Sequence, residues 1–466
     1  RLARGTVGLR VLVPMRFHAP PMVSPRAIVG SAAAALRPLR RGVAIEANGG
    51  HEAMPMRWRA PRTIPPCSVA TKPTASGTIA AARRRFDGNV ARAFCGSDEA
   101  LREEIARFAA MEPQPVSLQQ VLSVPEPWRA AKFLHTEIPI RYAERIRRIE
   151  SIPQWDAIAA LRQVHDQHVQ TFRDFRRVER TPDLSDFTIV VRDAVEQQKE
   201  VIRLMALAAH DLHEQRGPEE YGPEFADPLL NDFLLNRLGS QMLMAQYLAC
   251  VDKKRPTGII VPDLDAAALC RDSRDIVVGL CERLTGTRPV VDVQVFSAAK
   301  EDMVPGCAEG VPRFSYIPEF LDYIMRELLK NSCRATLEAL ERDGEASSDH
   351  RPIQVVVCAD EHHVTIRVSD RGRGIPHDVG QRVWSYLYST AHGDRRSPSE
   401  LAGFGVGLPI SRLYALYFGG SLNLVSLPGY GTDAYIFLPR LDSEQVEVVP
   451  DKDHSCKYSS MSDFVL

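Results

Sequence analysis

The spacing of apolar residues divides the chain into two parts with different architectures. From about residue 86 to residue 255, apolar positions recur every three or four residues, the period of amphipathic helices. Asp227-Pro228 offers an N-cap residue followed by proline, so we expect a helix to begin there. Several long helices joined by short polar segments predict a four-helix-type bundle. The helices are expected over residues 101–111, 158–175, 189–213 and 227–250.

From residue 256 to about residue 445 the period changes. Short runs rich in β-branched residues predict strands over residues 290–296, 353–357, 364–368, 421–425 and 434–438. Helical stretches are expected between them over residues 263–284, 318–342 and 407–418. Paired strands interleaved with helices predict an α/β sandwich, a mixed sheet with helices on one face. The fold class expected for the whole chain is therefore α+β.

Composition narrows the classes of function. The net charge of −1 gives no reason to expect a nucleic-acid partner, and no run of eighteen apolar residues predicts a membrane span. The nine cysteines are scattered without CxxC pairs, which favours a reducing compartment over a disulfide framework or a zinc site.

The two ends of the chain differ from the middle. Residues 1–85 contain fourteen arginines, one lysine and two acidic residues. This composition predicts disorder and is typical of a mitochondrial presequence. Residues 446–466 are expected to form a C-terminal tail.

The helix expected from Pro318 carries a polar stripe at Glu327, Asn331 and Arg334. The asparagine oxygen is a suitable Mg²⁺ ligand that does not repel phosphates, and the glutamate is a suitable acceptor for a hydroxyl proton. A stripe of this kind is also the ordinary solvated face of an amphipathic helix, so the helix alone does not decide between the two interpretations.

Two glycine-containing motifs follow. Asp370 ends an alternating strand and precedes Gly372 and Gly374, so its carboxylate could accept a hydrogen bond from an adenine amino group, although a tight turn explains the same residues. A second motif opens a helix, where amide groups can surround phosphate oxygens. Its residues are Gly403, Phe404, Gly405, Val406, Gly407 and Leu408. It matches neither the P-loop nor the dinucleotide fingerprint. Thr432 precedes the last strand.

Together these motifs resemble the Bergerat-type ATP site of GHKL proteins. The run from Arg326 to Thr336, the run Tyr388-Ser389-Thr390-Ala391 and the run from Leu401 to Ala415 are similar to the mitochondrial pyruvate and branched-chain α-ketoacid dehydrogenase kinases. This resemblance implies an ATP-dependent protein-serine kinase of the mitochondrial matrix, with a mobile lid over residues 389–402. The implied partners are the dehydrogenase α-subunit as substrate, the lipoyl domains of the acyltransferase core, and a second copy of the chain.

The resemblance also implies roles for single residues. Glu327 is the expected general base, Asn331 the expected Mg²⁺ ligand and Asp370 the expected adenine ligand. The other expected nucleotide-binding residues are Arg334, Gly372, Gly374, Ser389, Thr390, Gly403, Phe404, Gly405, Val406, Gly407, Leu408 and Thr432. Backbone carbonyls of Val383, Ser385 and Tyr388 match a potassium site of the family.

Three departures keep alternatives open. The position four residues before the base holds Tyr323, where pyruvate dehydrogenase kinases have histidine, and this favours the branched-chain kinases. The Tyr-Ser-Thr-Ala run and the short lid favour the pyruvate dehydrogenase kinases, slightly more strongly. Tyr247 stands where a bundle histidine is common, and no Asp-Trp motif occurs near the C-terminus. A histidine kinase and an ATP-binding pseudokinase or scaffold are the competing interpretations.

Overall fold

The computed structural model describes residues 98–450 and 464–465, with gaps at residues 118–119, 122–125, 253–256, 299–311, 346–347, 389–404 and 441–445. The predicted presequence lies outside the described residues, and so does the predicted boundary between residues 255 and 256. Two elements of the C-terminal region are described, residues 446–450 and the short strand β8.

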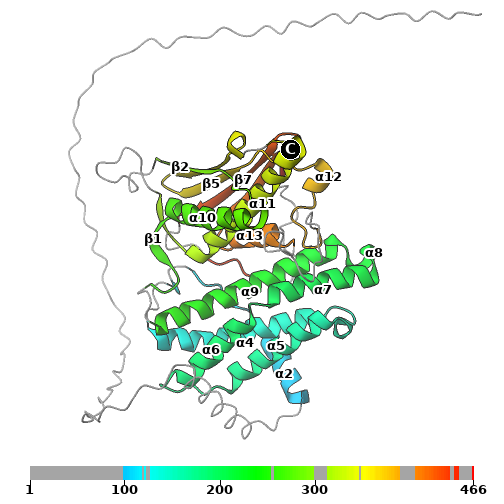
Figure 1. Ribbon diagram of the computed structural model, residues 1–466. Coiled ribbons are helices and arrows are strands. Elements are labelled where there is room, and N and C mark those ends of the chain that lie inside the picture. Colours follow the sequence, from blue (N-terminus) through cyan, green and yellow to red (C-terminus); the bar gives the residue numbers. More distant parts are fainter. Residues whose placement is uncertain are drawn as a thin grey trace, which may run out of the picture. The chain divides into compact units, whose positions relative to one another are not determined.

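A bundle of helices forms the first part, as the apolar period predicted. Helix α4 packs against α2, α5 and α9, and α5 packs against α7 (Figure 1). The helices are α2 (Asp98–Ala109), α4 (Pro127–Glu150), α5 (Ala159–Arg177), α6 (Ser185–Gln197), α7 (Val201–Arg216), α8 (Pro218–Tyr221) and α9 (Pro223–Val251).

Two details of the bundle differ from the prediction. The helix expected over residues 189–213 is two helices, because the chain turns between α6 and α7, where the buried Gln198 side chain donates a hydrogen bond to Tyr142 at 2.6 Å. The N-cap expected at Asp227 is wrong. Helix α9 begins at Pro223 after Gly222, and Asp227 lies within its second turn. A glycine followed by proline ends the preceding turn and starts the helix four residues earlier.

The second part is built on a six-stranded mixed sheet with the strand order β2-β4-β5-β7-β6-β8. Pairs β2–β4 and β6–β8 are parallel and the others antiparallel, including the hairpin of β4 and β5. The strands are β2 (Val291–Ser297), β4 (Ile353–Ala359), β5 (His363–Ser369), β6 (Ser421–Leu427), β7 (Gly431–Pro439) and β8 (Phe464–Val465). A separate antiparallel pair joins β1 (Val261–Asp265) to β3 (Arg313–Tyr316).

Helices cover one face of the large sheet, so the predicted sandwich is confirmed (Figure 1). They are α10 (Ala266–Thr285), α11 (Pro318–Asp343) and α13 (Gly407–Leu416), and a short helix α12 (His377–Gly380) follows β5. The helix expected from residue 263 begins three residues later, where the Asp265 side chain accepts a hydrogen bond from the Ala268 amide as an N-cap. The strands alternate buried and more exposed residues, which places their apolar side chains under these helices.

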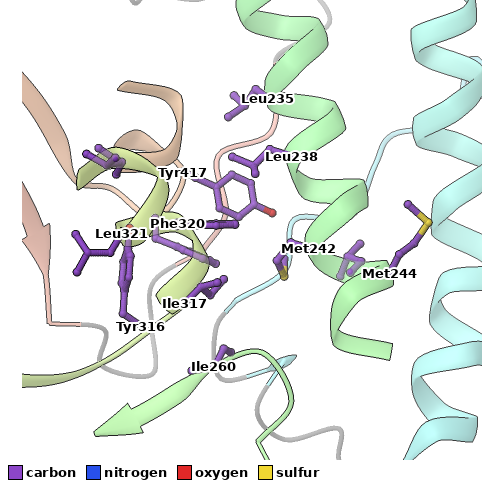
Figure 2. Packing of buried hydrophobic residues seen from close by; sticks show 14 of the residues in the cluster. Leu235, Leu238, Met242, Met244, Ile260, Tyr316, Ile317, Phe320, Leu321 and Tyr417 are labelled. Carbon is purple, nitrogen blue, oxygen red and sulfur yellow. The ribbon is translucent and has the colours of Figure 1, made fainter. Parts of the chain in front are cut away.

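The two parts share one apolar core. Figure 2 shows Leu238 and Met242 of α9 beside Phe320 of α11 and Tyr417, which directly follows α13, while Met244 points to the opposite side, toward the bundle. Bundle and sheet are thus packed directly against each other. The second part is therefore held in a defined position against α9, with α13 in direct contact with that helix.

A buried ionic group also joins the bundle to the second part, at the interface that we call the seam. Arg141 of α4 donates two hydrogen bonds to the Glu447 carboxylate, at 3.0 and 2.5 Å, and a third to Glu137 at 2.8 Å. The Tyr417 hydroxyl also donates to Glu447, and the Val116 amide does so at 3.0 Å. Because each charge is paired and bonded in several directions, the group is satisfied although it is fully buried.

Candidate functional site

Helix α11 places the first predicted residues along one stripe. Proline at its first position fits the helical backbone, and its apolar side is buried in the core. Glu327, Asn331 and Arg334 follow at intervals of four and three residues and line one cavity of about 1180 Å³. The solvated-face interpretation therefore does not describe the whole stripe, because these side chains line a cavity between elements.

Strand β5 delivers Asp370 to the same cavity. The carboxylate is 7% exposed, and its Oδ1 accepts hydrogen bonds from the amides of Gly372 at 2.9 Å and Thr432 at 3.3 Å. Its Oδ2 accepts one from the Ser332 hydroxyl at 2.9 Å. Burial raises the pKa of Asp370, and none of the ion pairs among the described residues includes it. A carboxylate held this way retains lone pairs for a donor in the cavity.

The β5–β7 register explains why Asp370 and Thr432 meet. Ser369 pairs with Asp433, and the next step along both strands is a hydrogen bond from the Asp370 amide to the Thr432 carbonyl at 2.9 Å. Gly431 lies so close that a Cβ atom there would clash with the Asp370 carbonyl oxygen. The glycine of the Gly-Thr motif is thus required by this close approach of two strands.

The N-terminus of α13 forms another wall of the cavity. Gly405 has a φ of 80°, in the left-handed region that glycine adopts without strain, and the helix begins at Gly407. The N-cap residue Val406 makes no side-chain capping hydrogen bond, and Pro409 has no amide hydrogen to satisfy. The amides of Gly407 and Leu408 and the positive end of the helix dipole therefore favour an anion such as a phosphate.

Most of the predicted nucleotide residues lie together around this one cavity. They come from α11, from the ends of β5 and β7, and from the start of α13. The predicted residues that line it are Glu327, Asn331, Arg334, Asp370, Gly372, Gly374, Val383, Tyr388, Gly405, Val406, Gly407, Leu408 and Thr432. Ser389, Thr390, Gly403 and Phe404, with the expected lid, lie outside the described residues.

Glu327 is held from three sides. Lys330 forms an ion pair with its Oε1 at 2.6 Å, and its other oxygen lies against Gly407, where a Cβ atom would collide with the carboxylate. Tyr323, one turn earlier, lines the same cavity, and burial, followed by the charge of Glu327, raises the pKa of the Tyr323 hydroxyl. Tyr323 therefore stays neutral near pH 7 and leaves Glu327 as the acceptor at this point of the cavity.

The predicted potassium residues lie in the segment that follows α12, over residues 381–388. Val383 and Tyr388 line the cavity, whereas Ser385 is buried and its hydroxyl donates a hydrogen bond to Asp227 of α9 at 3.1 Å. The Tyr386 amide donates to the same carboxylate at 3.0 Å. Burial raises the pKa of Asp227 to about 6. This link between the bundle and the segment that follows α12 was not predicted from the sequence.

The bundle supplies residues that sequence reasoning missed. Lys199, Ile202 and Arg203, at the start of α7, line the cavity together with α11 and α13. Ser332, which holds Asp370, was also missed, although it lies within the α11 motif.

Tyr247 is fully buried, with its hydroxyl 2.7 Å from that of Thr188. A buried tyrosine inside the bundle cannot take the part of an acceptor histidine, so the histidine-kinase interpretation loses support.

Comparisons with known proteins agree with this arrangement. Across the described residues, no helix combines the length and apolar character needed to cross a membrane. Residues 115–280 match the family model of the mitochondrial branched-chain α-ketoacid dehydrogenase kinase, and residues 316–442 match the model of the histidine kinase-, DNA gyrase B- and HSP90-like ATPases.

Curated relatives match over most of their length. The mitochondrial pyruvate dehydrogenase (acetyl-transferring) kinase of Arabidopsis thaliana is 32% identical over 372 residues, which cover 74% of this chain and 96% of the relative. Isozyme 4 of Homo sapiens is 32% identical, with 74% and 86% covered, and the kinase of Ascaris suum is 31% identical, with 75% and 89% covered. The resemblance seen in the motifs is confirmed: the chain belongs to the family of mitochondrial α-ketoacid dehydrogenase kinases.

Proposed function

We propose that this chain is an ATP-dependent protein-serine kinase that phosphorylates and thereby inactivates the dehydrogenase component of a mitochondrial α-ketoacid dehydrogenase complex. The observation that carries the proposal is the convergence of Glu327, Asn331, Asp370 and the α13 N-terminus on one cavity. The names of the relatives support pyruvate dehydrogenase as the substrate and the mitochondrion as the compartment. The matrix as the location within the mitochondrion rests on the resemblance of the motifs.

The proposed division of labour follows from chemistry. The buried Asp370 carboxylate accepts a hydrogen bond from the adenine amino group, and the first amides of α13 hold phosphate oxygens. Asn331 offers a neutral oxygen to Mg²⁺, which neutralises phosphate charge when it is bound. Glu327 orients the serine hydroxyl and accepts its proton.

The finer partners rest on the resemblance and on weaker support from the fold. The Ser385 carbonyl accepts one hydrogen bond, from the Tyr388 amide at 3.3 Å, and its second lone pair is available for the proposed potassium ion. The sheet face opposite the helices exposes Phe437 beside Tyr435, with ring centroids 6.3 Å apart, which supports a homodimer. We retain lipoyl-domain docking to the bundle as a proposal.

The test separates binding from transfer. Purified wild-type chain is incubated with radiolabelled ATP and, separately, with pyruvate and branched-chain dehydrogenase complexes, beside Glu327→Gln. We expect phosphate on a serine of the α-subunit for the wild type, a loss of about 100-fold or more for the variant, and nucleotide affinity within about twofold of wild type. Transfer by Glu327→Gln at the wild-type rate would exclude the base role, and ATP binding without transfer by the wild type would favour the pseudokinase.

A further inference from the structure

The cavity that contains Glu327 is not lined by the nucleotide domain alone. Lys199 lies in the turn before α7, and Ile202 and Arg203 lie in the first turn of that helix. More than a hundred residues of chain separate them from Glu327, yet they line the same space. A serine brought to Glu327 from solvent therefore meets side chains of the bundle as well as side chains of α11.

The two cationic side chains that the bundle contributes to the cavity, Lys199 and Arg203, form only weak ion pairs. Lys199 pairs with Glu196 at 2.6 Å and Arg203 pairs with Glu200 at 2.7 Å, both at a spacing of three residues. The side chains of Lys199 and Glu196 are 65% and 71% exposed. Exposed pairs of this kind contribute little to stability, so a carboxylate that arrives with a substrate can replace the glutamate.

Folding gives no reason for a cation at this place. The positive end of a helix dipole favours acidic residues in the first turn, and Arg203 lies in the first turn of α7. Around the cavity, six cationic and three acidic side chains are present among the described residues. The side chains that line the cavity therefore carry a net positive charge, which favours anionic ligands. Neither a catalytic base nor an adenine acceptor requires this charge.

We propose that Lys199 and Arg203 bind acidic side chains that flank the acceptor serine, and thereby select the protein segment that reaches Glu327. The inference rests on the proposed kinase function and extends it to the substrate class, a serine in an acidic segment. Ile202, between the two cations, offers apolar contact to the same segment. Neither cation acts on the transferred phosphate, so both are specificity residues and not part of the catalytic machinery.

The experiment compares two synthetic serine peptides that differ only in carrying aspartate or asparagine on both sides of the serine. For the wild type we expect KM for the aspartate peptide to be about tenfold lower than for the asparagine peptide, with similar kcat. In the double variant Lys199→Glu/Arg203→Glu the preference should vanish or reverse, while KM for ATP stays unchanged. Arg102→Glu is the control, since Arg102 forms an exposed pair with Glu99 at the same spacing, and it does not line the cavity.

Each other result overturns the proposal. Equal KM values for both peptides in the wild type exclude acidic selection, and a raised KM for ATP in the double variant assigns the cations to the nucleotide instead. If the wild type transfers no phosphate to either peptide, the kinase function has failed. Calorimetric titration of the aspartate peptide into the ATP-free protein then still measures peptide binding at Lys199 and Arg203. Absence of binding, or binding unaffected by the double substitution, would exclude the site.

Discussion

Two buried carboxylates, one at the seam with the bundle and one in the nucleotide cavity, are held in opposite ways. Glu447 receives two hydrogen bonds from the Arg141 guanidinium, so its charge is neutralised where it lies. Asp370 receives only neutral donors, two backbone amides and the Ser332 hydroxyl. The negative charge of Glu447 is thus neutralised by a cation, whereas that of Asp370 is not.

The difference separates structural from functional groups. A buried ion pair fills its own hydrogen-bonding capacity and has nothing left for a ligand. A buried carboxylate with neutral donors keeps its charge and its free lone pairs, at a cost in stability that a bound donor offsets. Burial alone therefore does not distinguish the two carboxylates; the presence or absence of a cationic partner does.

Loss of the paired carboxylate should have the largest effect. Glu447→Gln leaves the Arg141 charge buried without a full partner, and breaking a buried pair in this way costs about 3–5 kcal/mol of the free energy of unfolding. Urea denaturation followed by circular dichroism measures it. The triple variant Glu447→Gln/Arg141→Met/Glu137→Gln removes all three buried charges and should recover part of the loss. Unfolding of Glu447→Gln at the wild-type midpoint would show that the pair does not stabilise the seam.

The cavity carboxylate should behave in the reverse manner. Asp370→Asn keeps the shape but loses the charge, and we expect ATP affinity to fall by about 10- to 100-fold, since hydrogen bonds to a charged group contribute about 1.5–3 kcal/mol. Stability without nucleotide should be unchanged or slightly higher, because a buried unpaired charge is removed. Calorimetric titration with ATP and thermal unfolding measure the two quantities. A stability loss as large as that of Glu447→Gln would erase the distinction between the carboxylates.

The cavity could be predicted from the sequence because its chemistry lies in short motifs. Glu327 and Asn331 share one helix, and Gly405 is required by its own positive φ. Gly431 was recognised from its motif, although the close approach of β5 and β7 is what requires it. Each motif can therefore be recognised from its own residues, without knowledge of the fold around it. The sandwich followed for the same reason, since β-strand alternation with one face buried is a local pattern.

The seam could not be predicted, because its elements depend on distant partners. Helix α4 buries charged residues, among them Glu137 and Arg141, and this hides the apolar period by which a helix is recognised. The pairs of Lys199 and Arg203 with neighbouring glutamates look like any solvated helix face. Only the folded structure reveals that these side chains line a cavity together with residues of α11. The break at Gln198 likewise depends on Tyr142, more than fifty residues away.

Asp227 offers the smallest and most specific test, because it is a carboxylate without a cation that faces no nucleotide. Its donors are the Ser385 hydroxyl and the Tyr386 amide, and burial raises its pKa from 3.8 to about 6. The folded state therefore binds more protons than the unfolded state between these values. The stabilisation is fully present below about pH 3.8 and is lost as the pH rises through about 6. A fully buried group would lose about 3 kcal/mol, and we expect about 1 kcal/mol for this partly exposed one.

Asp227→Asn measures this contribution, because asparagine can still accept both hydrogen bonds through its side-chain oxygen. We expect the variant to be more stable than wild type at pH 7.5 and to lack the decline between pH 4 and pH 6, as measured by urea denaturation across the range. Asp183→Asn is the matched control, since Asp183 is exposed and its pKa is lowered by the hydroxyl and amide of Ser185, so its contribution has the opposite sign. If Asp227→Asn keeps the wild-type slope, the ionised carboxylate has a cationic partner in solution, and Asp227 belongs with Glu447 and not with Asp370.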